Sequence, residues 1–332
     1  MGWRDQPDVI PTDRLTAKQN LSPTPESSRR LRPGADVLGR GVRGWVMFLL
    51  LVACDAPAVL TDAGVPADAE VPGDAAAAPP STLGPAERPA RLYVPPAHDG
   101  TTALPLVVLL HGYTVDATIQ DLYFGLTRQA RRGGFYVLLP DGTIDADGEP
   151  HWDVLGTNLD DHAYLRALIE EAMGTLPVDP GAVSLIGHSN GGFMAYRMAC
   201  DSADLVTGIV SLAGSEASMA CEPSSDVAVL QIHGTTDSTV SFDGGTIAGL
   251  DYGSATETVE RWATRAGCEP SPTAGPRLDL VTDVDGEETA PTVYGGCRAG
   301  VELWVMEGVD HIPALTAEFT PSVLAWLGAH VR

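Results

Sequence analysis

Basic side chains are scarce in this chain of 332 residues, which has 20 Lys and Arg against 44 Asp and Glu and a net charge of −24. Most of the excess belongs to residues 91–332, which have 11 basic and 33 acidic side chains. An anionic body repels phosphate backbones and anionic lipid headgroups. The composition therefore argues against nucleic-acid binding and against a basic membrane-docking patch. The 44% of hydrophobic residues still indicates a globular domain rather than a disordered acidic tail.

A long apolar run is also missing near the N-terminus. The run at residues 45–53 has nine residues, whereas a bilayer span needs about 20. A basic flank before a short apolar core is typical of a secretory signal. The run ends in Leu51-Val52-Ala53-Cys54, which resembles the lipobox of bacterial lipoproteins, where the cysteine is acylated and becomes the mature N-terminus. We interpret 1–53 as a targeting region and Cys54 as the lipid attachment site, the alternative being a cysteine in an ordinary signal peptide.

The residues before this run are too many and too rich in proline for a typical signal, so we expect the true translation start near Leu38 or Val42. After Cys54, residues 54–90 have little with which to build a core. Ala, Pro and Gly make up 21 of these 37 residues, and Phe, Trp, Tyr and Ile are absent. Such a segment cannot bury enough apolar area to offset its ordering entropy. The composition predicts a flexible tether that holds the body away from a membrane.

Residues 91–332 alternate between compact apolar runs and segments with helical spacing. Continuously apolar runs are typical of parallel strands covered on both faces. After a first strand at 91–94, the expected strands are 106–110, 135–139, 183–186, 208–212, 227–232 and 301–306. The expected helices are 160–173, capped by Asp160 or Asp161, then 257–266 and 316–331. This alternation predicts a mostly parallel α/β sheet with ligands at the carboxyl ends of its strands.

The first chemical motif is the Gly187-His188-Ser189-Asn190-Gly191 turn between an expected strand and an expected helix. Glycines are needed on both sides because the turn is so sharp that larger side chains would collide. The turn lifts the serine hydroxyl above the sheet at a helix N-terminus. Ser189 is therefore the expected nucleophile, and the alternative is a Gly-rich loop with an incidental serine.

A nucleophilic serine needs a base, which in α/β-hydrolases comes last in the chain order of serine, acid and histidine. Three histidines follow Ser189: His233, His311 and His330. His233 comes in a turn directly after a strand, and His330 is near the end of the last helix. His311 lies in a loop just after the strand at 301–306, where a base is required. We therefore expect His311 to be the base.

The base in turn needs a carboxylate that orients it. Asp237 follows the strand at 227–232 by a few residues and is the expected acid, with Asp243 and Asp251 as alternatives. An oxyanion needs two backbone N–H donors, one from the residue after the nucleophile and one from an early loop. The expected donors are Asn190 and Tyr113.

His111, two residues before Tyr113, could act as a second base, but we expect it to shape the oxyanion loop. Two side chains are candidates for substrate contact. These are His188, beside the nucleophile, and Trp152, whose ring could stack on an aromatic or sugar group. For Trp152 we favour packing within its loop. Trp262 and Trp304 fall on regular elements and are expected in the core.

At this point the chain resembles a known family, the secreted polyhydroxyalkanoate depolymerases and feruloyl esterases of the α/β-hydrolase fold. The resemblance rests on Gly187-His-Ser-Asn-Gly-Gly192, Pro140-Asp-Gly142, Asp160-Asp161 with Leu165-Arg-Ala-Leu-Ile169, Pro177-Val-Asp179, and Ile232-His-Gly-Thr235 with Asp237. It runs from about Arg91 to the C-terminus and implies Ser189, Asp237 and His311 as the catalytic triad.

The chain departs from the family at two points. Gly308-Val309-Asp310-His311-Ile312-Pro313 stands where the family often has Gly-Gly-Gly-His-Thr-Trp-Pro, so we expect a different pocket wall there. Tyr113-Thr114 stands in the oxyanion loop, where many members have a cysteine or a Gly-rich stretch.

Besides Cys54 the chain has four cysteines: Cys200, Cys221, Cys268 and Cys297. An even number in an exported body indicates two disulfides with three connectivities open, whereas free thiols would fit a cytosolic protein. The family resemblance favours Cys200 with Cys221 and Cys268 with Cys297. No His/Cys cluster has zinc spacing, and the segment 283–287 is more typical of a hairpin turn than of a calcium loop. We therefore expect neither a metal nor a cofactor.

Together these features predict an exported serine esterase that hydrolyses feruloyl, acetyl or hydroxyalkanoate esters through an acyl-enzyme intermediate. We expect a monomer that acts on small or oligomeric esters and reaches a membrane only through its lipid anchor, on the periplasmic or surface face of the cell envelope. The alternative is a secreted protein. One rival is a peptidase of the prolyl-oligopeptidase type, which usually has a large additional domain before the hydrolase. Another is a non-catalytic lipid-anchored binding module, which would not need Ser, Asp and His at three strand ends.

Overall fold

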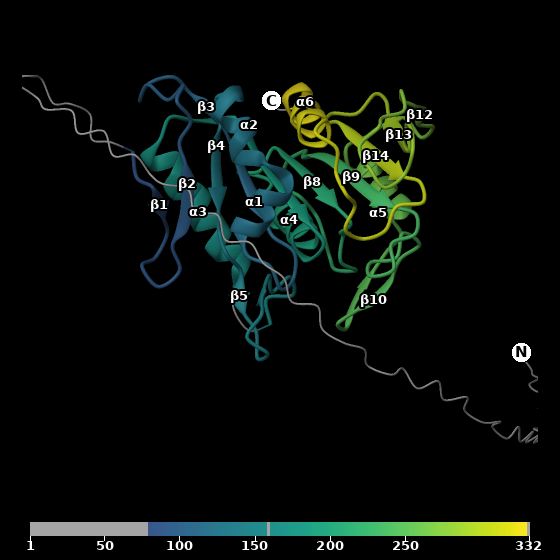
Figure 1. The fold of residues 1–332 in the computed structure, drawn as a ribbon, viewed down its shortest axis with the longest axis horizontal. Coiled ribbons are helices and arrows are strands. Elements are labelled where there is room, and N and C mark those ends of the chain that lie inside the picture. The colour runs from purple at the N-terminus through teal and green to yellow at the C-terminus, as the bar shows by residue number, and fades with distance from the viewer. Residues whose placement is uncertain (1–78, 158–159, 331–332) are drawn as a thin grey trace, which may run out of the picture. The chain divides into compact units, whose positions relative to one another are not determined.

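A computed structural model of the chain describes residues 79–157 and 160–330, so the targeting region, Cys54 and most of the expected tether lie outside the described residues. Within them, the main sheet has the order β1-β2-β4-β3-β7-β8-β9-β14-β13-β12 (Figure 1). Its strands are β1 (Thr82–Leu83), β2 (Ala90–Tyr93), β3 (Leu104–Leu110), β4 (Tyr136–Leu139), β7 (Val178–His188), β8 (Gly208–Leu212), β9 (Ala228–Gly234), β12 (Thr273–Ala274), β13 (Thr289–Tyr294) and β14 (Val301–Met306). Two short hairpins pair β5 (Thr143–Ile144) with β6 (Pro150–His151) and β10 (Gly245–Ile247) with β11 (Leu250–Tyr252).

The six central strands, from β4 to β14, run parallel, and the strands at both edges of the sheet are antiparallel. The register places Leu110 of β3 opposite Gly187 of β7, and Met306 of β14 opposite Gly234 of β9. The loops after β3, β7, β9 and β14 therefore leave the sheet along one edge, which is where the predicted catalytic residues stand.

Three helices cover each face of the sheet. The helices are α1 (Ala117–Phe124), α2 (Leu126–Gly133), α3 (Asp161–Thr175), α4 (Asn190–Asp201), α5 (Ala255–Arg265) and α6 (Phe319–His330). One buried cluster joins α3, α4 and α5 to the sheet, and a second joins α1, α2 and α6 to the opposite face. Successive residues of β3 alternate between these clusters, because side chains along a strand point to opposite faces. This two-sided burial confirms the predicted open α/β architecture.

The helix ends follow from local hydrogen bonds. Asp160 caps α3 as expected and accepts from the backbone N–H of Ala163 at 2.9 Å. Helix α5 begins before the expected residue 257, because Ser254 and Glu257 form a reciprocal capping box. Helix α6 begins later than expected, because Leu315 forms a β-bridge with Val281 and the N–H of Thr316 donates to the carbonyl of Leu280, so this segment pairs with another strand segment.

The folded body begins before Arg91, although the composition assigns residues up to 90 to the tether. Leu83 of β1 is buried in a core cluster, and Ala90 of β2 is fully buried. Arg88, between these strands, donates to the carboxylate of Asp161 at 2.7 Å. Two buried apolar residues and one ion pair thus fix a segment whose average composition predicts no structure. Trp262 and Trp304 are both buried, as expected.

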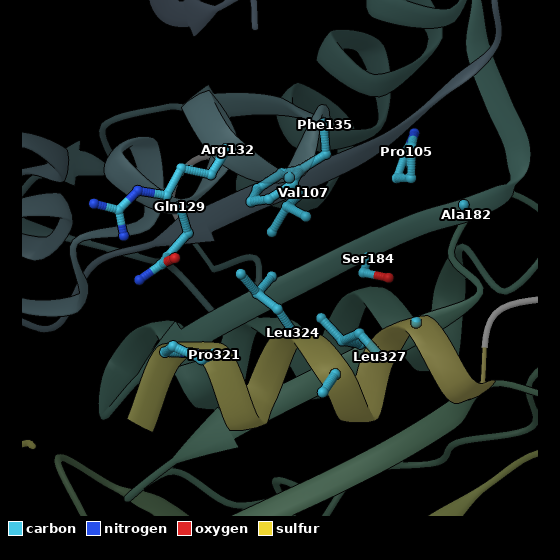
Figure 2. Close-up of a pocket in the computed structure, with 13 residues that line it drawn as sticks. Pro105, Val107, Gln129, Arg132, Phe135, Ala182, Ser184, Pro321, Leu324 and Leu327 are labelled. Atoms are coloured by element: carbon cyan, nitrogen blue, oxygen red, sulfur yellow. The ribbon is translucent and has the colours of Figure 1, made fainter. Parts of the chain in front are cut away.

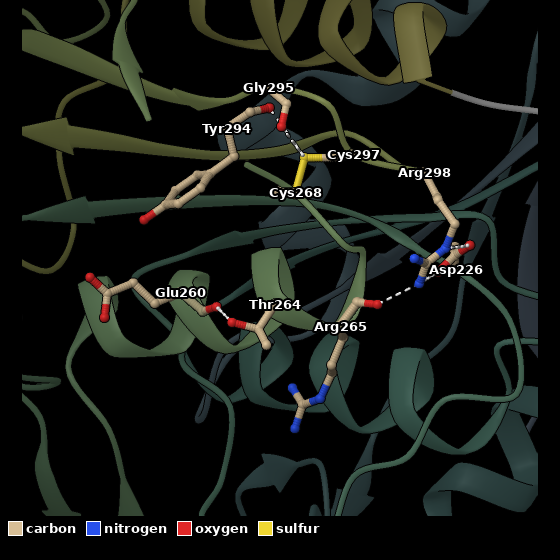
Figure 3. Close-up of a disulfide and its surroundings, with 9 residues drawn as sticks. All are labelled: Asp226, Glu260, Thr264, Arg265, Cys268, Tyr294, Gly295, Cys297 and Arg298. Carbon is tan, nitrogen blue, oxygen red and sulfur yellow. Dashed lines mark hydrogen bonds and ion pairs between the residues drawn. A yellow bond between two sulfur atoms is a disulfide. The ribbon is translucent and has the colours of Figure 1, made fainter. Parts of the chain in front are cut away.

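Two disulfides close loops on the body, Cys200–Cys221 and Cys268–Cys297, and these are the pairings that the family resemblance implies. The second joins the end of α5 to the loop before β14 (Figure 3). Beside it, Arg298 donates to Asp226 at 2.8 Å and to the carbonyl of Arg265 at 2.6 Å. The segment 283–287 lies in the connection between β12 and β13 rather than in a tight hairpin turn.

Opening the second disulfide should destabilise the body. In the chain-entropy model a cross-link across a separation of 29 residues contributes about 3 to 4 kcal/mol. We expect the Cys268→Ser/Cys297→Ser double variant to lower the free energy of unfolding by this amount, measured in guanidinium chloride. The Cys200→Ser/Cys221→Ser variant, with a separation of 21, should lose slightly less. A loss under about 1 kcal/mol would contradict this origin of stability.

Candidate active site

The predicted nucleophile lies on a strained turn between β7 and α4. Ser189 has φ 53° and ψ −119°, a left-handed conformation that a residue with a side chain rarely adopts. A Cβ at Gly187 would lie 2.1 Å from the carbonyl oxygen of Gly191, and one at Gly191 would lie 2.3 Å from that of Leu110. The backbone packing therefore requires glycine at both positions, for the reason that the sequence motif indicates.

The three residues predicted to form a triad are hydrogen-bonded in series. The hydroxyl of Ser189 lies 2.9 Å from Nε2 of His311, and Nδ1 of His311 lies 2.8 Å from Oδ2 of Asp237. Asp237 comes from the loop after β9 and His311 from the loop after β14. The alternative acids, Asp243 and Asp251, are not in this series. This is the arrangement of a nucleophile, a base and an acid that orients the base.

Asp237 is held as an anion. Burial would raise the pKa of its carboxyl group, but hydrogen bonds from His233 and His311 outweigh burial and keep that pKa well below its ordinary value. The backbone N–H groups of Thr239 and Val240 also donate to Oδ1, at 2.9 and 2.8 Å. The carboxylate that faces His311 is therefore ionised and fixed in orientation.

His233, the rejected alternative for the base, lies behind this acid. The amide of Gln231 donates to Nδ1 of His233 at 3.0 Å and to the carbonyl of Gly214 at 2.8 Å. The proton of His233 is therefore on Nε2, which lies 2.8 Å from the carbonyl of Val240 and 3.3 Å from Asp237 Oδ2. Both ring nitrogens are engaged inside the protein, so His233 orients the acid and does not face Ser189.

His188 does not contact the cavity above Ser189, which corrects the prediction of a substrate-contacting residue. Its ring is buried, and its Nε2–H donates to the carbonyl of His311 at 3.1 Å. Burial lowers the pKa of His188 to about 4, despite the opposing effect of that hydrogen bond. A neutral His188 therefore holds the backbone of the loop after β14, which supplies His311, through this hydrogen bond.

Two backbone N–H groups lie near the serine without a partner in the described part of the chain, those of Tyr113 and Asn190. A Cβ added to Gly112 would lie 3.7 Å from Cβ of Ser189, so the turn at Tyr113 passes beside the nucleophile. Thr114, with φ 70°, fixes this turn by donating its N–H to the carbonyl of Pro150 at 3.0 Å. These are the expected oxyanion donors.

Trp152 is buried beside the oxyanion loop. It packs within its own loop, which was favoured over substrate contact. Its indole N–H donates to the carbonyl of His111 at 3.0 Å, and the side chain is 1% exposed. The side-chain amide of Asn190 bonds both backbone groups of Trp152, at 2.6 and 3.0 Å. His111 bonds Gly112 and Gly142 through its two ring nitrogens, and burial lowers its pKa. His111 therefore has a structural role, as expected.

A cavity of about 530 Å³ opens over Ser189. Trp152 lines it, so substrate contact by this residue stays a prediction. Aliphatic and aromatic side chains that also line it include Val154, Leu155, Phe193, Val240, Ile247 and Leu250. The last two belong to the β10–β11 hairpin, which the sequence pattern does not predict. Tyr113 also lines the cavity, and its hydroxyl donates to Asp145 at 2.8 Å. The serine therefore faces a mostly apolar chamber with one polar wall.

Asp310 connects the two loops that supply the acid and the base, a role that no sequence motif indicates. Its Oδ1 accepts from the backbone N–H of Ser238 at 2.8 Å, from the hydroxyl of Ser238 at 3.0 Å and from the backbone N–H of His311 at 2.8 Å. Ser238 follows Asp237 directly. One carboxylate oxygen therefore joins the backbone of the base, His311, to Ser238, the residue after the acid. The only sequence signal is that an aspartate stands where the family often has glycine.

The described residues include no group of three or more His, Cys, Asp or Glu side chains arranged to hold a metal ion. None of the helices in residues 79–157 and 160–330 has the length and apolar character needed to cross a membrane.

A parallel sheet with serine, aspartate and histidine on adjoining loops at its carboxyl edge defines a hydrolase of the α/β type, and comparisons with known proteins agree. Residues 81–266 match the Esterase family, described as "Putative esterase". The "Putative esterase NocK" of Nocardia uniformis subsp. tsuyamanensis is 30% identical over 259 residues, which cover 70% of this chain and 74% of that protein. Feruloyl esterase C of Emericella nidulans is 29% identical over 204 residues, covering 59% and 68%.

Among solved structures, the acetyl xylan esterase from Aspergillus awamori has a TM-score of 0.53 at 16% identity, covering 73% of this chain and 94% of that one, which shows a shared fold. The chain belongs to the Esterase family and is a carboxylic ester hydrolase with the α/β-hydrolase fold.

Substitution of Asp310 tests whether its carboxylate positions the loops that supply Asp237 and His311. We expect Asp310→Ala to lower kcat for p-nitrophenyl acetate about 10- to 100-fold with little change in KM, because small misplacement of catalytic groups slows the chemical step. Asp310→Asn should retain most of the activity, since its amide oxygen can accept the same three hydrogen bonds. Steady-state kinetics of both variants would check this, and full activity of Asp310→Ala would refute the positioning role.

Proposed function

We propose that the protein is an exported serine esterase that acts through an acyl-enzyme intermediate. The hydrogen-bonded series from Asp237 through His311 to Ser189, placed beside two backbone N–H groups without partners, carries the proposal. Each of these groups has the role that ester hydrolysis by a serine nucleophile requires. Membership of the Esterase family supports the same reaction over that of a peptidase or a binding module.

In the first half of the reaction, the hydroxyl oxygen of Ser189 attacks the ester carbonyl carbon and Nε2 of His311 takes its proton. Asp237 accepts a hydrogen bond from Nδ1 and stabilises the imidazolium that forms. The carbonyl oxygen becomes an oxyanion that accepts from the N–H groups of Tyr113 and Asn190. Collapse of this intermediate breaks the ester C–O bond, and His311 protonates the leaving alcohol.

In the second half, water replaces the alcohol. His311 removes a proton from the water as its oxygen attacks the acyl carbon, and the same donors stabilise the second oxyanion. When the bond to Ser189 breaks, His311 returns the proton to the serine oxygen. The products are a carboxylic acid and the original enzyme.

The cavity indicates which esters suit the site. An acetyl group would leave most of the apolar wall around Phe193, Ile247 and Leu250 unfilled, whereas an aromatic acyl group would bury apolar surface against it. Similarity to feruloyl esterase C points the same way. We therefore place feruloyl-type esters, soluble or oligomeric, before acetyl and hydroxyalkanoate esters.

Export is the second part of the proposal. Two disulfides support an oxidising compartment, because reducing compartments keep such thiols free. The basic flank, the short apolar run and Cys54 in the N-terminal sequence support lipid attachment to the cell envelope. In this arrangement a monomer meets its ester substrates outside the cytoplasm, and its lipid is the contact with the membrane.

The serine mechanism is tested by Ser189→Ala in the full-length chain. We expect hydrolysis of methyl ferulate and p-nitrophenyl acetate to fall by a factor on the order of 10⁴ or more, because no other group can form the acyl-enzyme. Labelling by a fluorophosphonate probe should disappear with it. Initial rates and gel detection of the probe measure the two effects.

The matched control is Ser224→Ala, which makes the same change at an exposed position outside the catalytic cavity. It should keep wild-type rates and labelling. Equal activity of Ser189→Ala and Ser224→Ala would remove the proposed nucleophile.

A further inference from the structure

A second cavity, of about 460 Å³, lies on the sheet face that carries α1, α2 and α6. Figure 2 shows it between α2 and α6, with side chains of both helices and of the strands beneath pointing into it. Its apolar wall includes Val107, Phe135, Leu324 and Leu327. It shares no lining residue with the cavity over Ser189. We call this second cavity the α2–α6 groove.

The rim of the groove carries positive charge in a body that is otherwise strongly acidic. Arg132 and Gln129 of α2 line the groove (Figure 2). Arg128 stands one helical turn before Arg132 in the same helix. The eight residues of α2 hold three arginines and no acidic residue. This cluster is the exception to a net charge of −24.

These three arginines have no side-chain partner among the residues that the structure describes. Arg128, Arg131 and Arg132 form no ion pair or hydrogen bond with any side chain in residues 79–157 and 160–330. Elsewhere in those ranges, acidic side chains pair with nearly every arginine: Arg88, Arg166, Arg197, Arg261, Arg265, Arg277 and Arg298.

Helix stability accounts for only part of this cluster. Basic residues in a last turn interact favourably with the helix dipole, which fits Arg131 and Arg132. Arg128 lies outside that turn and is four residues before Arg132, a spacing at which like charges repel. An anion beside Arg132 would relieve this repulsion. An apolar groove that ends at an arginine and a side-chain amide matches a molecule with an apolar tail and an anionic head.

We propose that the α2–α6 groove is a non-catalytic binding site for a single-chain amphiphile with a carboxylate head. Its hydrocarbon tail packs against Val107, Phe135 and Leu324, and its carboxylate accepts hydrogen bonds from Arg132 and Gln129. The site is independent of the proposed esterase mechanism, because none of its residues touches the catalytic groups.

The test is titration of the full-length chain with monomeric octanoate, followed by isothermal calorimetry, with 1-octanol as the neutral amphiphile of the same length. Octanoate should bind more tightly than 1-octanol, and added salt should weaken octanoate selectively. Arg132→Gln should weaken octanoate about tenfold or more, because it removes a charge-assisted hydrogen bond. The matched control is Arg91→Gln, which removes an arginine that also lacks an ion pair but lies outside the groove, and it should bind as the wild type does.

A second variant tests the location of the tail. Gly328 of α6 lines the groove, and a Cβ there would meet no atom within 4 Å, so Gly328→Leu fits the fold and fills the groove. It should abolish binding of both amphiphiles while leaving thermal unfolding unchanged or slightly raised.

Octanoate affinity that survives Arg132→Gln and Gly328→Leu would overturn the site. So would absence of octanoate binding in a chain that adsorbs through α2 to phosphatidylglycerol vesicles, a result that would assign the arginines to a membrane surface.

Discussion

The catalytic end of the protein depends on one strained turn. Ser189 is held at a positive φ, which costs on the order of 1 to 3 kcal/mol for a residue with a side chain. The surrounding packing sustains that strain. The N–H of Ser189 is bonded to the carbonyl of Leu212 at 2.9 Å, and β7 is buried between β3 and β8. Gly187 and Gly191 leave no space for a Cβ, so the helix packs directly against the strands at this turn.

The remaining groups of the site are placed relative to this turn by contacts from other strands. The oxyanion loop is held by Trp152, which the side chain of Asn190 binds through two backbone hydrogen bonds. The loop that supplies His311 is held by two contacts. His188 donates to the carbonyl of His311, and the carboxylate of Asp310 accepts from its N–H. The parallel strands β3, β7, β9 and β14 therefore place four loops at one edge of the sheet, and short polar contacts between the loops set their spacing. A rigid sheet with cross-linked loops gives the preorganisation that oxyanion stabilisation requires.

Local patterns in the sequence predicted the parts of this account that depend on local structure. The Gly-x-Ser-x-Gly turn, the apolar parallel strands and the cap at Asp160 each follow from neighbouring residues. Asp237 and His311 followed from chain order and from their places after strands. Contacts between distant segments were not predictable in this way. Asn190 binds Trp152 across 38 residues, and Asp310 binds Ser238 across 72.

Elements with a weak pattern were missed for a related reason. Helix α2 has eight residues and buries only Leu126 and Ala130, so two apolar residues four apart were too few to indicate a helix. The short strand β1 contributes one buried leucine within an Ala/Pro-rich stretch, and its order comes from partners elsewhere in the chain. Average composition predicted a tether there, whereas a few tertiary contacts determine the fold of that segment.

The central claim is that Ser189 and two backbone N–H groups act together on one carbonyl. The most direct measurement is a crystal structure of the enzyme after reaction with a fluorophosphonate, whose phosphonyl group mimics the tetrahedral intermediate. The account predicts a covalent bond to Oγ of Ser189 and one phosphonyl oxygen within hydrogen-bond distance of the N–H groups of both Tyr113 and Asn190. An adduct on another residue, or an oxygen turned away from both donors, would contradict it.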